Sequence, residues 1–222
     1  MKVGTDGVLL GAWCPLTDNP SPITHILDVG TGSGLIALML AQRCPNAQID
    51  AIDIDPNAVE QAKENGVNAY LSRLQDWPNH QSKISNHKCY DLIVSNPPYF
   101  RNSLKNPDEG RKTARHTDSL SYEELITHSV RLLNPDGLLA LILPAEEEQN
   151  VCALAVAAGL FLTRLTRVYS KESKPARRVL LAFRKSPITN HQSQILEDTL
   201  VLEDEKGGRS AAYSKLCEGF YL

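Results

Sequence analysis

Short apolar runs alternate along the chain with segments of helical length. Runs rich in Val, Ile, Leu and Ala predict strands at residues 25–29, 47–53, 67–71, 90–95, 138–143, 161–169, 178–183 and 199–202. Helices are expected at residues 35–43, 56–65, 121–133 and 145–158. This alternation is typical of an α/β protein with a doubly wound, mostly parallel sheet covered by helices.

Several helix boundaries carry local signals. Asp55 is an expected N-cap with Pro56 at the first helical position, and Gly66 stops that helix. Ser121 and Glu124 have the spacing of a capping box. Residues 134–137, Asn-Pro-Asp-Gly, predict a turn, and residues 2–13 predict a loop followed by a buried apolar turn.

The composition is that of one soluble domain. The chain has 222 residues, 42% hydrophobic and 22% charged, with net charge −3, and we expect a single domain over residues 1–222. No secretory signal opens it, and its longest nearly apolar stretch, residues 151–162, is shorter than the roughly 20 residues of a membrane span. Five scattered cysteines lack metal-ligand spacing. These features predict a cytoplasmic protein with no metal and no membrane contact, and we expect it to be a monomer.

A glycine-rich turn joins the first predicted strand to the first predicted helix. Residues 28–34 read Asp-Val-Gly-Thr-Gly-Ser-Gly, and such glycines let a backbone turn sharply and approach a ligand. Asp53 closes the second predicted strand, where an acid can accept hydrogen bonds from ribose hydroxyls. The two features together predict a nucleotide-containing cofactor, whereas the turn alone is also compatible with plain tight packing.

The most specific motif is Asn96-Pro97-Pro98-Tyr99, directly after the strand at residues 90–95. Prolines fix the backbone and have no N–H group, so the backbone at these two positions offers hydrogen-bond acceptors and no donors. The Asn96 side chain adds an acceptor, and the Tyr99 ring offers a stacking face. The Asn96 oxygen and the Pro97 carbonyl can accept both hydrogens of a planar amino group and hold its nitrogen toward a methyl donor. We therefore predict that Asn96, Pro97, Pro98 and Tyr99 form the catalytic centre, against the alternative of a proline-rich strand exit.

The Asp-x-Gly-x-Gly-x-Gly pattern resembles that of class I S-adenosylmethionine-dependent methyltransferases, and residues 96–99 resemble the motif of amino-methyltransferases. The resemblance implies a seven-stranded Rossmann-like sheet with an antiparallel C-terminal strand and S-adenosyl-L-methionine as cofactor. It places Asp28 at the ammonium group and Asp53 at the ribose. Arg73 stands where the family has an acid that meets the adenine. The implied cofactor-binding residues also include Gly30, Thr31, Gly32, Gly34, Ile54 and Asn96.

Residues 2–13 closely resemble those of the tRNA1(Val) adenine-N6 methyltransferases, as do residues 38–43, 178–183 and 220–222. This resemblance implies methylation of the adenine at tRNA position 37. It adds Thr5 and Asp6 to the cofactor contacts, within an N-terminal covering segment of residues 1–22. Residues 195–222 are expected to form a strand and a tail.

Two segments are locally basic. Residues 101–115 have charge +3 and residues 164–185 have charge +7. Both are predicted to flank the active edge of the sheet, where they can contact RNA phosphates. The candidate RNA-binding residues are Arg101, Arg111, Arg115, Arg177 and Arg178. A solvated basic surface is the alternative for each, and Arg178 has a further structural alternative because it starts a strand.

Other activities remain open at this stage. The Asn96–Tyr99 motif also resembles that of glutamine N5 methyltransferases of release factors and of rRNA amino-methyltransferases. A DNA adenine methyltransferase needs a recognition region for which no length remains. A non-catalytic binding module with the same fold is disfavoured by the intact motif.

Overall fold

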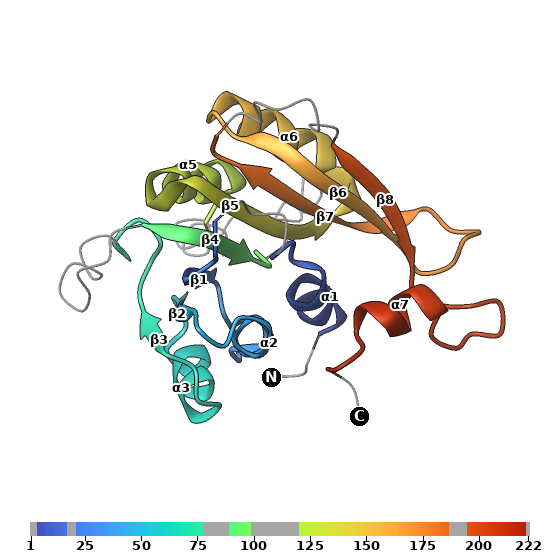
Figure 1. Ribbon diagram of the computed structural model, residues 1–222, viewed down its shortest axis with the longest axis horizontal. Helices are drawn as coiled ribbons and strands as arrows, with labels where there is room; N and C mark the ends of the chain where they lie inside the picture. The colour runs from blue at the N-terminus through green and yellow to red at the C-terminus, as the bar shows by residue number, and fades with distance from the viewer. Residues whose placement is uncertain (1–3, 17–20, 78–88, 99–119, 187–194, 221–222) are drawn as a thin grey trace, which may run out of the picture.

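The computed structural model describes residues 4–16, 21–77, 89–98, 120–186 and 195–220. Within these ranges eight strands form one sheet in the order β3-β2-β1-β4-β5-β7-β6-β8 (Figure 1). Neighbouring strands are parallel except where β7 pairs with β5 and β6. The strands are β1 (His25–Val29), β2 (Gln48–Asp53), β3 (Ala69–Leu71), β4 (Tyr90–Ser95), β5 (Leu133–Pro144), β6 (Phe161–Tyr169), β7 (Ala176–Arg184) and β8 (Leu196–Val201).

The predicted α/β class with a mostly parallel sheet is confirmed, with two differences in detail. The described chain has eight strands in its sheet instead of seven. The antiparallel strand is β7, because the short connection after β6 reverses the chain. The last strand, β8, instead lies parallel to β6 at the edge of the sheet.

Helices cover both faces of the sheet (Figure 1). The helices α1 (Thr5–Trp13), α2 (Leu35–Arg43) and α3 (Pro56–Glu64) lie on one face, and α7 (Ala211–Leu216) packs into the same core as α1 and α2. The helices α5 (Tyr122–Leu132) and α6 (Glu148–Ala157) cover the other face, with the short 3-10 helix η1 (Ala145–Glu147) before α6. Alternate residues of β1, β4 and β5 fill these two cores, as expected for strands buried on both sides.

The predicted helix signals are confirmed where the structure describes them. Asp55 caps α3 by accepting a hydrogen bond from the Asn57 amide, and Pro56 is the first helical residue. The capping box of Ser121 and Glu124 is complete at the start of α5. Since these caps use side chains two or three residues away, the sequence alone is sufficient to locate them.

Two local predictions differ from the structure. The expected turn at residues 134–137 lies inside β5, where the pairing with β4 shifts between Tyr90 and Leu92. The N-terminal segment is a helix of nine residues, α1, rather than a brief buried turn. It packs closely on α2 because Gly11 has no side chain: a Cβ there would lie 2.8 Å from the Met39 sulfur. Among the described residues, no helix has the length and apolar character needed to cross a membrane.

Candidate active site

The glycine-rich turn forms the link between β1 and α2. The amides of Gly30 and Thr31 donate to the carbonyl of Ile52 at 2.9 and 3.1 Å, so the turn is bound to the adjacent strand β2. Gly30, Gly32 and Gly34 all have positive φ angles, of 72°, 57° and 84°. This left-handed backbone strongly favours glycine, which explains the spacing seen in the sequence.

Asp28 lies beneath this turn and is completely buried. The hydroxyl of Thr31 donates to its Oδ2 at 2.7 Å, whereas its Oδ1 accepts no hydrogen bond within the described residues. Burial raises the pKa of the Asp28 carboxyl to about 6, although the hydrogen bond from Thr31 opposes that rise. A buried carboxylate oxygen without a donor is costly, and it would be stabilised by a cationic group that reached it.

Asp53 ends β2 and accepts two backbone hydrogen bonds. Its Oδ2 accepts from the Gly32 amide and its Oδ1 from the Asp55 amide, both at 2.9 Å. Asp53 therefore holds the glycine turn in shape. Each carboxylate oxygen can accept more than one hydrogen bond, so the predicted ribose contact is compatible with this arrangement.

The predicted catalytic motif begins where β4 ends, beside the glycine turn. Ser95 pairs with Val29 in the parallel register of β4 and β1, and its hydroxyl donates to the Val29 carbonyl at 2.8 Å. Asn96 is half-buried, Pro97 is buried and Pro98 is exposed. Tyr99, the fourth predicted catalytic residue, lies outside the described residues. The described part of the motif and the glycine turn thus follow directly on two adjacent parallel strands, β4 and β1, at the carboxyl ends of both.

Two apolar side chains are exposed at the ends of β2 and β3. Ile54 follows Asp53, and Leu71 pairs with Asp53, with exposed fractions of 52% and 51%. Ile54 is one of the predicted cofactor contacts, whereas Leu71 has the sequence pattern of an ordinary strand residue and was not predicted as a contact. Such apolar surface beside a polar turn is suited to cover a flat ring.

The segment after β3 is anchored by a buried polar network. The Trp77 indole donates to the Tyr90 hydroxyl at 2.9 Å, and that hydroxyl donates to Asp50 at 2.8 Å. Burial and the nearby Asp50 charge raise the pKa of the Tyr90 hydroxyl, so it remains a donor. The network fixes residues 72–77 against the sheet, and Arg73 in that segment is exposed.

Thr5 and Asp6 form the first turn of α1. Gly7, one residue on, lies against Leu35 at the start of α2, so the first turns of the two helices are close together. Asp6 forms an ion pair with Arg178 at the start of β7, with 2.9 Å between Oδ2 and Nε. The structure therefore brings together a predicted cofactor contact and a predicted RNA contact.

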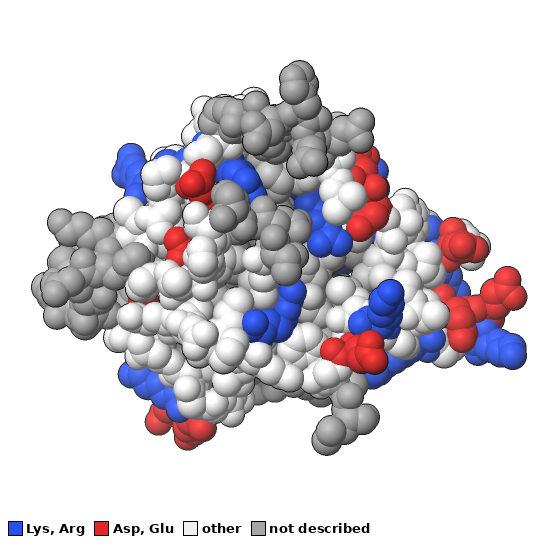
Figure 2. Space-filling view, in the orientation of Figure 1, with Lys and Arg blue, Asp and Glu red and all other residues white. Residues whose placement is uncertain are grey.

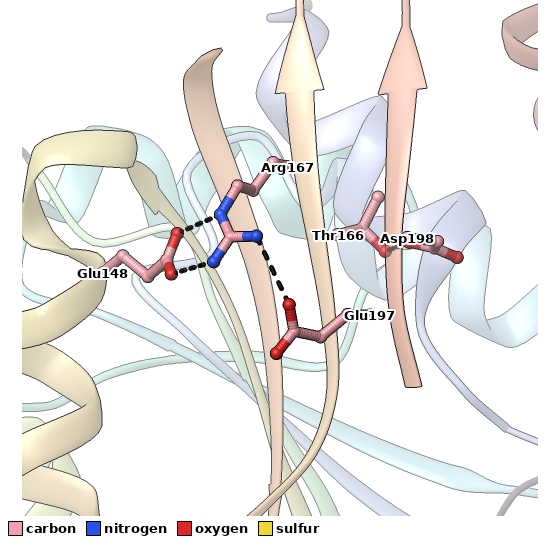
Figure 3. A network of polar contacts seen from close by, with 5 residues as sticks. All are labelled: Glu148, Thr166, Arg167, Glu197 and Asp198. Atoms are coloured by element: carbon pink, nitrogen blue, oxygen red, sulfur yellow. Dashed lines mark hydrogen bonds and ion pairs between the residues drawn. The ribbon is translucent and has the colours of Figure 1, made fainter. Parts of the chain in front are cut away.

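Four of the eight basic residues in the segment 164–185 form ion pairs with acids. Figure 3 shows Arg167 of β6 between Glu148 of α6, 2.8 Å from its Nε, and Glu197 of β8. Arg164 pairs with Asp198, and Lys171 pairs with Glu203, at 3.3 and 3.4 Å. The +7 charge counted along the sequence is therefore not a +7 surface.

On the face shown in Figure 2, the described basic groups lie apart or beside acidic groups instead of forming one continuous patch. Arg177 is exposed at the start of β7 and remains available to a ligand. Three predicted RNA contacts lie outside the described residues: Arg101, Arg111 and Arg115. Within the described ranges, no group of three or more His, Cys, Asp or Glu residues is arranged to hold a metal ion.

Comparison with known proteins gives consistent matches. The profile of the "Methyltransferase small domain" family matches residues 16–155. A tRNA1(Val) (adenine(37)-N6)-methyltransferase of Phocaeicola vulgatus is 42% identical over 223 residues, covering 100% of this chain and 91% of the relative. A protein of the same name from Parabacteroides distasonis is 44% identical over 228 residues, with the same coverage.

Solved structures share the fold at low sequence identity. A predicted O-methyltransferase from Agrobacterium tumefaciens has a TM-score of 0.70 and 16% identity, covering 97% of this chain and 96% of that one. A putative class I S-adenosylmethionine-dependent methyltransferase from Listeria monocytogenes has a TM-score of 0.61 and 14% identity, covering 100% and 74%.

Proposed function

The chain belongs to the tRNA1(Val) (adenine(37)-N6)-methyltransferase family, within the methyltransferase small-domain proteins, and on this premise we propose that it methylates N6 of adenine 37 in tRNA1(Val). It is an S-adenosyl-L-methionine-dependent enzyme. The observation that carries the proposal is the position of Asn96 beside the glycine turn, across the Ser95–Val29 pair. Ligands of open α/β sheets bind at this kind of place, where the strand order changes direction.

The residues at the edge of the sheet fit this cofactor. The unpaired Oδ1 of Asp28 suits the ammonium group of its methionine part. The turn lets a ligand come close to the backbone, because the space beside Gly30 is open: a Cβ there would meet no atom within 4 Å. Asp53 suits the ribose, and Ile54 with Leu71 supplies exposed apolar surface for the adenine. When bound, the cofactor supplies a methyl group on a positively charged sulfur.

Positioning and electrostatics account for the chemistry assigned to the chain. The N6 lone pair of adenine is delocalised into the ring, which makes it a weak nucleophile. Asn96 Oδ1 and the Pro97 carbonyl accept the two N–H hydrogens, fix the nitrogen toward the methyl group and stabilise the positive charge that develops on it. Tyr99 supplies a face on which the unstacked base rests. Attack needs no general base, because the nitrogen is neutral, and the methylated nitrogen then loses one of its two protons to water.

The RNA surface combines described and undescribed residues. We assign phosphate contacts to Arg177 and to the segment that holds Arg101, Arg111 and Arg115, which gives binding that weakens with salt. Adenine 37 lies in a loop, so it enters the pocket without a duplex being opened. The enzyme acts as a cytoplasmic monomer, without metal.

The test is methyl transfer to defined RNA. The purified 222-residue protein is incubated with labelled S-adenosyl-L-methionine and unmodified tRNA1(Val), followed by mass spectrometry of the nucleosides. We expect N6-methyladenosine in this tRNA and none when position 37 is guanine. Transfer to the glutamine of a release factor, or to rRNA, with none to tRNA1(Val) would contradict the proposal and favour the two rival activities.

A further inference from the structure

Asp6 and Arg178 connect two elements that are 172 residues apart in the chain. Asp6 lies in the first turn of α1, and Arg178 lies at the start of β7. Both side chains are about three-quarters covered, with exposed fractions of 22% and 27%. A charge-assisted hydrogen bond at this level of burial is less screened than one on the open surface.

The direction of α1 brings its first turn to the carboxyl ends of β1 and β4, where the candidate active site lies. A Cβ at Gly7 would lie 3.1 Å from Leu35, and one at Gly11 would lie 2.8 Å from Met39. Since both contacts advance by four residues along the chain, α1 and α2 run side by side in the same direction. Helix α2 begins directly after the glycine turn, at Leu35. The first turn of α1 therefore lies beside the turn that approaches the cofactor.

That first turn has little local support. The N-cap of α1 is Gly4, which has no side chain to cap the helix. Arg178 supplies support from another element. Its backbone is fixed between Pro144 of β5 and Val168 of β6, and its Nη1 donates to the Arg177 carbonyl at 2.9 Å. The guanidinium is thus oriented by the sheet before it meets Asp6.

We propose that Arg178 is a positioning residue that acts through Asp6 to hold the first turn of α1 against the cofactor, and is not a phosphate contact. This inference rests on the proposed function for the identity of the cofactor. Arg178 has its charge neutralised by Asp6 and is largely covered, whereas its neighbour Arg177 is exposed. Adjacent arginines on one strand thus have different tasks.

The test measures cofactor binding without RNA. Isothermal titration calorimetry measures the Kd with which S-adenosyl-L-methionine binds to the wild type and to three variants, Arg178→Gln, Arg178→Lys and Asp6→Asn. We expect Kd to rise about tenfold in Arg178→Gln, and less in Arg178→Lys, which keeps the charge. Adding Arg178→Gln to Asp6→Asn should change Kd by less than twofold, because the partner through which Arg178 acts is already lost.

Arg177→Gln is the matched control. It should leave the cofactor Kd unchanged while weakening tRNA binding and reducing its dependence on salt by about one phosphate contact. The inference is overturned if Arg178→Gln behaves in the same way, or if it lowers the Tm without altering Kd. Should Arg178→Gln fail to fold, Arg178→Lys decides by the same criterion. Because calorimetry uses no tRNA, a failure of the proposed RNA substrate is seen separately.

Discussion

The hydroxyl of Ser95 donates a hydrogen bond to the carbonyl of Val29 at 2.8 Å, joining the ends of β4 and β1. These strands are neighbours in the sheet although 66 residues separate the two partners. The next residues are Asn96 on one strand and Gly30 on the other. Together with the parallel pairing of β4 and β1, this bond holds the predicted catalytic motif next to the glycine turn, and a small displacement here would misalign the groups assigned to the reaction.

Replacing Asn96 tests the catalytic assignment. Asn96→Ala removes the acceptor that we assign to the amino nitrogen, and we expect kcat to fall by about 10²- to 10³-fold. The cofactor Kd should change by no more than about threefold, because the glycine turn and Asp28 are intact. Single-turnover transfer to tRNA and calorimetry measure the two quantities. Asn150→Ala on α6 is a matched control, since Asn150 is exposed and bonds to Glu147; unchanged transfer in Asn96→Ala would refute the assignment.

Asp28 should make the stability of the cofactor-free protein depend on pH. The folded-state pKa of about 6 lies above the ordinary value of 3.8, so the native state holds a proton that the unfolded state releases. Protonated Asp28 therefore favours the folded state. This contribution to the free energy of unfolding is fully present below about pH 4 and is lost as the pH rises through about 6. The two pKa values correspond to about 3 kcal/mol in the free energy of unfolding.

The variant Asp28→Asn removes this dependence. Urea unfolding of wild type and variant at pH 5 and pH 8 isolates the contribution of Asp28, because all other titrating groups are shared. We expect the variant to gain in stability relative to wild type between these pH values, and to lose cofactor affinity at pH 8. A stability difference that is the same at both pH values would contradict the pKa and its burial origin.

Sequence patterns predicted the elements whose determinants are local. The bounds of α2 and the caps Asp55 and Ser121 are confirmed, because capping uses side chains within one turn. Contacts between distant segments were not readable in this way. The ion pair of Asp6 with Arg178 and the pairing of Arg167 with two acids depend on which strands become neighbours. Counting charges along the sequence therefore overestimated the basic surface.

Two glycines of the glycine turn allow the cost of backbone strain to be distinguished from the cost of crowding. Gly30 and Gly34 both have positive φ, but a Cβ at Gly34 would lie 2.6 Å from Val67, whereas one at Gly30 meets nothing within 4 Å. Gly30→Ala should cost about 1–2 kcal/mol in unfolding free energy, from the left-handed backbone alone. Gly34→Ala should cost about 2–4 kcal/mol, because overpacking adds to that strain. Equal losses in urea unfolding would contradict the crowding at Gly34.

Arg167 offers the complementary test of the basic segment. Its guanidinium bonds to Glu148 through two nitrogens and to Glu197 through one, which joins α6, β6 and β8 (Figure 3). Its side chain is 35% exposed, so Arg167→Gln should cost only about 1 kcal/mol in unfolding free energy. Because the charge is already neutralised by two acids, the variant should leave the tRNA Kd and its salt dependence as in wild type. A flatter dependence of log Kd on log salt, as expected for Arg177→Gln, would instead make Arg167 a phosphate contact.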